Sequence, residues 1–183
     1  MKPKWYLNVP YDSLFTIVFD KEKKRILKQV SNAIIEHIGS TSIPGLDGKG
    51  YIDIIVSTPK KDLNKVKKIL ENKLGYEYKK DISVKKERFF FQRIASSEYS
   101  KKTFYHLHLT YLNSNNFKLA ISFRDFLIKN PEYIKRYSEL KKTASKAAQK
   151  AKDKKEARTI YKKIKDPLIK EIINKISLKD LRY

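Results

Sequence analysis

The sequence predicts an α/β (α+β) fold, in which a mixed β-sheet is packed with helices and the C-terminal half is helical. Apolar residues at 33–38 and 51–57 flank a loop rich in glycine and hydroxyl groups, a pattern typical of two joined strands. Helical and strand-like patterns alternate after this pair, which indicates a sheet with helices on at least one face. From Asn116 onward the apolar spacing is helical to the end of the chain.

The length of 183 residues fits one domain. We therefore expect a single domain over 1–183, with a sheet-containing core over about 1–112 and a helical extension over about 113–183.

The first part of the chain predicts two helices and five strands. Asp12 is a plausible N-cap for a first helix, because apolar residues recur at helical spacing from Leu14 to Val30. Thr58-Pro59 can begin a second helix of about fourteen residues that ends at Gly75. A polar loop is expected from Ala95 to Lys102. The strands are expected at 33–38, 51–57, 76–81, 88–95 and 104–110.

Three helices account for the remainder. The first contains Phe117 to Leu127 and is stopped by Asn130-Pro131. The second begins at Pro131 and the third near Asp153, with apolar residues at helical spacing in both.

Composition narrows the classes of function. The absence of cysteine excludes disulfides and thiolate chemistry, so a metal would need carboxylate, imidazole or phosphate ligands. No apolar run is long enough for a membrane span and no signal peptide is evident, so we expect a cytoplasmic protein. The net charge of +22 suits a polyanionic partner such as RNA or a nucleotide. A lysine-rich coding bias would give the same charge with no such partner.

The loop after the first strand has the residues of a phosphate cradle. Gly39 permits a sharp turn, and Ser40, Thr41 and Ser42 offer hydroxyls beside free backbone amides. Asp53 lies in the apolar strand that follows, where a metal ion would give a reason for a buried carboxylate. An ordinary connection between strands with a solvated aspartate is the alternative.

Histidines supply further candidate ligands. Strand alternation predicts that His106 and His108 point to one face of their strand. They could bind a metal, contact phosphate or move a proton, or they could simply be hydrogen-bonded on a half-exposed strand. Glu36 and His37 point to opposite faces, so only one of them can join Asp53, and we favour His37 as the additional metal ligand.

One long segment resembles a known family. The pair Gly39-Ser40 ahead of Asp53 resembles the signature of the DNA polymerase beta-like nucleotidyltransferase superfamily. The segment His37-Ile38-Gly39-Ser40-Thr41-Ser42-Ile43-Pro44-Gly45-Leu46, with Lys49 and Ile52-Asp53-Ile54, resembles the GrpB-like family within it. The resemblance continues through Val9-Pro10-Tyr11-Asp12, Arg88-Phe89-Phe90-Phe91, the His106 and His108 pair, Phe123 to Leu127, Tyr137, Lys141, Tyr161 and Lys165.

The resemblance implies a nucleotidyltransferase that moves a nucleoside monophosphate from a nucleoside triphosphate to an unidentified acceptor, with Mg²⁺ or Mn²⁺. Asp53, His106 and His108 would be the catalytic residues. Gly39, Ser40, Thr41, Ser42, Lys49 and Arg124 would bind the triphosphate, and Asp53, His37, His106 and His108 would be the metal ligands. For Arg124, an internal ion pair with Asp125 is the alternative.

One position departs from the superfamily pattern. Active members carry a second carboxylate two residues after the first, and here that position is Ile55. The two histidines could replace the missing ligand. Otherwise the chain would bind a nucleotide, a coenzyme A-like phosphate ligand or RNA without catalysis.

The stretch from Lys141 to Lys165 holds eleven Lys and Arg against two acids. It could form a face for a structured RNA, or a solvated helix surface.

Overall fold

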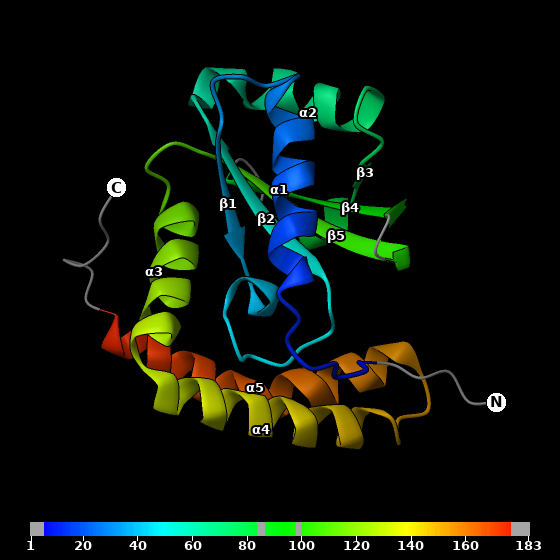
Figure 1. The fold of residues 1–183 in the computed structure, drawn as a ribbon, viewed down its shortest axis with the longest axis vertical. Helices are drawn as coiled ribbons and strands as arrows, with labels where there is room; N and C mark the ends of the chain where they lie inside the picture. Colours follow the sequence, from blue (N-terminus) through cyan, green and yellow to red (C-terminus); the bar gives the residue numbers. More distant parts are fainter. Residues whose placement is uncertain (1–5, 84–86, 98–99, 177–183) are drawn as a thin grey trace.

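A five-stranded mixed sheet carries the fold in the computed structural model, which describes residues 6–83, 87–97 and 100–176 (Figure 1). The strands lie in the order β1-β2-β5-β4-β3. They are β1 Ile34–Ile38, β2 Ile52–Thr58, β3 Glu77–Tyr78, β4 Arg88–Ser97 and β5 Ser100–Tyr111. The α-helices are α1 Leu14–Leu27, α2 Leu63–Asn72, α3 Asn115–Lys129, α4 Pro131–Ala148 and α5 Lys154–Lys175, and the 3-10 helices are η1 Ser40–Ser42, η2 Lys60–Asp62 and η3 Lys80–Ile82.

Strand pairing brings the two chemically interesting strands together. β1 and β2 are antiparallel and are joined by the loop that contains η1. β2 pairs in parallel with β5, although about forty residues separate them in the sequence. Side chains of directly paired residues point to the same face of a sheet, so the register decides which groups can meet.

One face of the sheet packs against α1 and α2. Ile54, Phe91 and Leu107 from three neighbouring strands form its centre and are fully buried. On α2 the apolar residues Val66 and Leu70 follow at helical spacing and complete this core. Truncating a residue such as Leu70 to alanine would cost about 2–5 kcal/mol.

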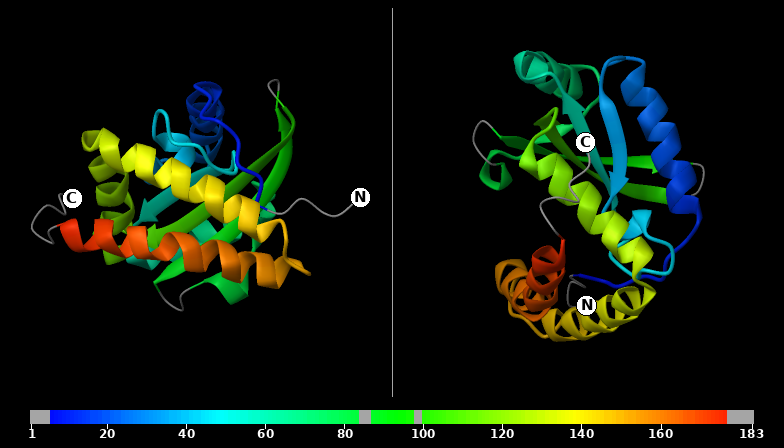
Figure 2. Two further views of the ribbon diagram at one scale, coloured as in Figure 1. Left: turned by 90° about the horizontal axis from the view of Figure 1, so that it is seen from below. Right: turned by 90° about the vertical axis from the view of Figure 1, so that its left-hand side faces the viewer.

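The other face of the sheet is covered at its β1 edge by α3. Ile38 and Ile55 pack there against Phe117 and Ile121. Helices α4 and α5 lie side by side and antiparallel across one end of the sheet (Figure 2). Their apolar residues clamp Ile43 of the loop between β1 and β2, which fixes that loop against the helical half of the chain.

Small residues allow α4 and α5 to approach closely. Ala144, Ala148 and Ala157 are fully buried between them. Tyr161 of α5 also stacks on Tyr6, with ring centroids 4.7 Å apart. The helix pair thereby also holds the segment before α1.

The predicted fold class is confirmed, and several element bounds differ. The polar loop expected over 95–102 is wrong, since β4 and β5 continue to a hairpin in which Ser97 pairs with Ser100. Antiparallel pairing satisfies the backbone there in spite of the polar sequence. Conversely, the strand expected at 76–81 is only Glu77–Tyr78, followed by η3.

The expected helix starts and ends also shift. The first helix ends at Leu27 rather than near Val30, and Asp12 Oδ1 accepts a hydrogen bond from Leu14 N at 2.9 Å just before it. The second begins with the 3-10 turn η2. In the described ranges, no helix is both long enough and apolar enough to cross a membrane.

Candidate active site

Gly39 brings the loop after β1 into contact with Asp53. Its φ of +72° is in the region that favours glycine. A Cβ at this position would lie 2.3 Å from Asp53 Oδ2, closer than any side chain allows. The loop backbone therefore passes directly over the carboxylate, which only glycine permits.

The three loop hydroxyls have different surroundings. Thr41 is buried, and its hydroxyl donates to the Tyr51 carbonyl at 2.9 Å and accepts from His37 Nε2 at 3.0 Å. Ser42 Oγ donates to the Gly39 carbonyl at 2.7 Å, which closes the turn. Ser40 Oγ lies beside Gly48, where a Cβ would be 2.1 Å from it. Thr41 and Ser42 thus hold the loop in shape, and Ser40 is the hydroxyl suited to a ligand.

Asp53, His106 and Gln92 form a hydrogen-bonded chain across three strands. The His106 Nδ1 atom lies 3.2 Å from Asp53 Oδ1, and its Nε2 atom lies 3.0 Å from Gln92 Nε2. Because an amide nitrogen can only donate, His106 Nε2 accepts and Nδ1 carries the proton that bonds Asp53. Both ring nitrogens are occupied, so His106 orients the carboxylate rather than offering a free metal-binding atom.

The environment keeps Asp53 ionised. Burial raises the pKa of its carboxyl, but the hydrogen bond from His106 and the nearby His106, His108 and Lys49 lower it by more. The net effect is a pKa below the ordinary value. Asp53 is therefore a carboxylate over the whole range around neutral pH.

His108 lies one residue pair farther along the same face, opposite Ile55. Its Nδ1 atom accepts a hydrogen bond from Arg88 Nη1 at 2.8 Å. Burial lowers the pKa of His108 to about 4, so the imidazole is neutral at pH 7. The structure brings His106 and His108 to one face, as alternation predicted, but only His106 touches Asp53.

The choice of His37 as a partner of Asp53 is wrong. His37 pairs with Ile54, so it points to the opposite face of the sheet, where it stacks on Phe19 with centroids 4.5 Å apart. Glu36 pairs with Ile55 and lies on the face of Asp53. Alternation within β1 alone could not decide between Glu36 and His37, because the register of β1 with β2 determines which of the two shares a face with Asp53.

Arg124 is bound by protein groups. It forms ion pairs with Glu36 Oε2 at 2.7 Å and Asp125 Oδ1 at 2.9 Å, and Nη1 also donates to the His37 carbonyl at 2.9 Å. The internal ion pair considered from the sequence is therefore present. Arg124 fastens α3 to β1 and at the same time neutralises Glu36.

Three lysines from separate elements are near enough to Asp53 for its charge to act on them. Lys49 follows the loop, Lys141 is on α4 and Lys165 is on α5, and the charge of Asp53 raises the pKa of each. Burial is the larger influence and lowers all three pKa values. In the ranges the structure describes, none of them lies within 4 Å of a carboxylate oxygen. We call Lys49, Lys141 and Lys165 the lysine cluster.

Lys141 is the most deeply placed of the cluster. It is 5% exposed, its Nζ donates to the Asp47 carbonyl at 3.0 Å, and it lies over the Tyr137 ring. Burial lowers its pKa to about 7, assisted by the charges of Lys165 and Lys49. A Cβ on Gly48 would be 3.5 Å from Nζ, so the ammonium and the Ser40 hydroxyl lie on the same side of that glycine.

Sequence reasoning missed two of these lysines as site residues. Lys141 follows Tyr133 and Tyr137 at a spacing of four, on the buried stripe of α4. A lysine within an apolar stripe is the signal that could have found it. The other nine basic residues from Lys142 to Lys163 are all exposed, so most of that stretch is surface.

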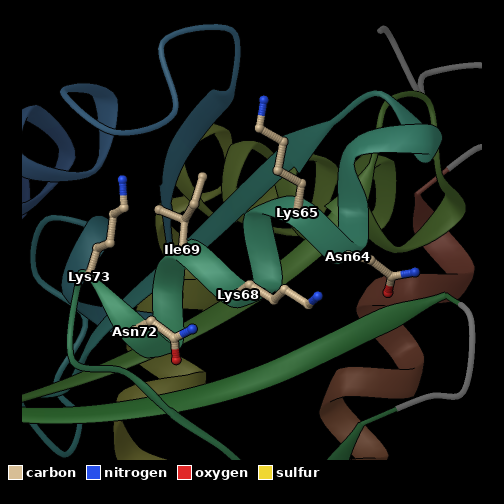
Figure 3. Close-up of a pocket in the computed structure, with 6 residues that line it drawn as sticks. All are labelled: Asn64, Lys65, Lys68, Ile69, Asn72 and Lys73. Carbon is tan, nitrogen blue, oxygen red and sulfur yellow. The ribbon is translucent and has the colours of Figure 1, made fainter.

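A separate hollow on the exposed side of α2 lacks these features. Figure 3 shows the side chains that line it, which are Asn64, Lys65, Lys68, Ile69, Asn72 and Lys73. It contains no carboxylate or imidazole, so it has no group for metal binding or proton transfer.

The family model described as GrpB protein matches residues 8–175. The chain belongs to the GrpB family. A UPF0157 protein of Vibrio cholerae is 30% identical over 75% of this chain and 69% of its own length. The glutamate-rich protein GrpB of Alkalihalophilus pseudofirmus is 31% identical over 68% of this chain and 72% of its own length.

Solved structures agree with the family. The crystal structure of conserved protein GrpB from Enterococcus faecalis matches 90% of this chain and 98% of its own, with a TM-score of 0.68 and 26% identity. A mutant of Cid1 poly(U) polymerase bound to MgATP matches 76% of this chain and 45% of its own, with a TM-score of 0.53 and 14% identity. At that identity the likeness shows the fold alone, which is nucleotidyltransferase-like.

The side chains of this GrpB family member fit one hard cation better than two. Magnesium is commonly held by one or two carboxylates together with substrate phosphates, and Asp53 offers one such carboxylate. Ile55 occupies the second position and Glu36 is neutralised by Arg124. Across the described residues, no three or more His, Asp or Glu side chains gather as a metal site. These side chains therefore fit one ion that would take Asp53 as a protein ligand and its other ligands from the phosphates of a bound triphosphate.

Proposed function

We propose that this GrpB family member binds a nucleoside triphosphate with Mg²⁺ or Mn²⁺ at Asp53 and transfers the nucleoside monophosphate to an acceptor. One observation carries the proposal. Lys141 lies on the same side of Gly48 as the Ser40 hydroxyl, and the charge of Asp53 acts on all three lysines of the cluster, none of which has a carboxylate within 4 Å among the described residues. Partly buried cations left in this state favour a bound polyanion.

Each group has a defined task in this proposal. Ser40 and the loop backbone at Gly39 hold phosphate oxygens, and the lysine cluster neutralises their charge. Asp53 holds the cation, which when bound would withdraw charge from the phosphates. His106 and Gln92 keep the Asp53 carboxylate in one orientation. Catalysis then rests on positioning and charge, as phosphoryl-type transfers require.

A second candidate is nucleotide binding without transfer. Two observations favour it, namely Ile55 at the position of the second carboxylate and the neutralisation of Glu36 by Arg124. Both remove a ligand for a second cation. A binder of this type would keep the phosphate cradle but would not release pyrophosphate.

Turnover separates the two candidates. The full-length protein is incubated with each of the four labelled ribonucleoside triphosphates, Mg²⁺ or Mn²⁺, and a cell extract as the source of acceptor. Transfer predicts pyrophosphate release and a labelled product, both abolished by Asp53→Asn and by Lys141→Met. Lys146→Met is the matched control, because Lys146 is exposed on the same helix. Binding without pyrophosphate release in every reaction contradicts the transferase and supports the binder.

A further inference from the structure

A second hollow adjoins the site on the far side of Gly39. A cavity of about 460 Å³ lies between the sheet and helices α3, α4 and α5. Most of its wall is apolar, and includes Ile38, Ile55, Phe123, Ile169 and Ile173. Its volume and composition are those of a pocket for a small organic molecule.

Arg88 is the one cationic side chain among the described residues that line this cavity. Its guanidinium donates to His108 Nδ1 at 2.8 Å and to the Ile82 carbonyl at 3.2 Å, and both acceptors are neutral. Among the described residues, its buried Nε atom has no hydrogen-bond partner. In the ranges that the structure describes, no carboxylate oxygen lies within 4 Å of Arg88. A half-buried guanidinium with only neutral partners can still accept an anion in its fork.

The cavity and the lysine cluster are neighbours along three elements. On α4, Tyr137 lines the cavity and Lys141 follows one turn later in the cluster. On α5 the order is reversed, with Lys165 in the cluster and Ile169 in the cavity one turn on. Gly39, which lines the cavity and touches Asp53, marks the junction between them.

We propose that this cavity binds the acceptor, a small organic anion with an apolar body whose carboxylate or phosphate head pairs with Arg88. The inference rests on the proposed function, because the attacking oxygen of the acceptor must approach the α-phosphorus from the side opposite the leaving pyrophosphate. A head-group oxygen, already deprotonated, would form the new bond to phosphorus as the bond to pyrophosphate breaks, and pyrophosphate leaves. Ile55 is then an apolar wall of the acceptor site. Its place in the cavity gives a reason for an isoleucine where a second carboxylate would repel an anionic acceptor.

Calorimetric titration of the protein with octanoate and octanol tests whether the charge of Arg88 binds the anionic head group. We expect octanoate to bind at least tenfold more tightly than octanol, and Arg88→Met to abolish that ratio while leaving the affinity for octanol unchanged. Unaltered octanol binding also shows that the variant is folded. Equal affinity of the wild-type protein for both probes, or a ratio that survives Arg88→Met, overturns the proposal. Octyl phosphate in place of octanoate then distinguishes the two head groups.

A second variant tests the location. Ile173→Trp fills the cavity from α5 and leaves the Arg88 charge in place, and we expect it to weaken the binding of both probes at least tenfold. Unchanged binding places the probes elsewhere and overturns the proposal.

Saturating MgATP tests the relation to the proposed function. We expect octanoate and MgATP to bind together, and displacement of one by the other overturns the acceptor role. MgATP binding with no octanoate binding overturns the cavity proposal alone. Octanoate binding with no MgATP binding contradicts the proposed function and leaves the cavity as an organic-anion site.

Discussion

Gly39 and Asp53 are in direct contact, so that a Cβ on residue 39 would lie 2.3 Å from the carboxylate oxygen Oδ2. This contact joins the loop to the strand that carries Asp53, the carboxylate proposed to hold the cation. The geometry of the proposed phosphate cradle therefore depends on residue 39 being a glycine.

Gly39→Ala should weaken triphosphate binding at least tenfold. The added methyl group must displace Asp53, and the positive φ adds strain of about 1–2 kcal/mol. Gly75→Ala is the matched control, because Gly75 also has a positive φ of 64° but has open space around it. Calorimetric titration with MnATP measures both. Equal effects of the two substitutions would show that strain alone, and not contact with Asp53, matters.

Anion affinity should fall as pH rises through 7. Burial and the neighbouring lysines lower the pKa of Lys141 to about 7, so this side chain is charged at pH 6 and neutral at pH 8.5. Sulfate keeps its charge over that range and is a suitable probe. We expect its affinity to drop several-fold between pH 6 and 8.5, and Lys141→Arg to flatten the profile because arginine stays protonated. An unchanged slope in the arginine variant would contradict the assignment.

Acid should destabilise the fold partly through His37. Burial lowers its pKa to about 4, below the ordinary 6.5. Between these two pH values the unfolded chain binds a proton on His37 and the folded chain does not, which favours unfolding. The free energy of unfolding contributed by His37 is complete above pH 6.5 and is lost towards pH 4. The loss is on the order of 3 kcal/mol.

Urea unfolding at pH 7.5, 5.5 and 4.5 measures this loss. His37→Gln keeps a hydrogen bond to Thr41 without titrating, so it should flatten the dependence on pH. His108 shifts in the same direction, and the variant should therefore keep about half of the slope. A slope equal to that of the wild-type protein would refute the role of His37.

Glu22 should contribute strongly to the free energy of unfolding, on the face of the sheet that packs against α1 and α2. It is 4% exposed and accepts hydrogen bonds from Arg25 at 2.6 Å, Tyr76 at 2.7 Å and Arg93 at 3.2 Å. Glu22→Gln leaves two arginines without their anion and should cost about 2–4 kcal/mol. Glu71→Gln breaks only the partly exposed pair with Lys67 and should cost under about 1 kcal/mol. Similar losses of urea stability in both variants would contradict this account.

Local sequence patterns predicted the fold class and which side chains share a face within one strand. Asp53, His106 and His108 could be assigned to faces of their own strands from period-two spacing. The preference for His37 over Glu36 failed because spacing within one strand does not tell which face its neighbour uses. Only the pairing of His37 with Ile54 settles that question.

Groups brought in by the helical half were harder to predict. Lys141 and Lys165 stand among many other lysines, and nothing in their local sequence reveals that Asp53 is nearby. The cavity that Arg88 lines is formed only when α3, α4 and α5 pack against the sheet. Such long-range packing is invisible to periodicity, whereas the lysine in the stripe of Tyr133 and Tyr137 was a readable sign of burial.

A crystal structure of the protein with a non-hydrolysable triphosphate and Mn²⁺ tests the central claim most directly. We predict that the phosphate oxygens lie within hydrogen-bond distance of Ser40, Lys141 and Lys165, with the manganese anomalous peak on Asp53. A triphosphate bound instead on the exposed lysines of α2 or α5, with no manganese at Asp53, would contradict the account.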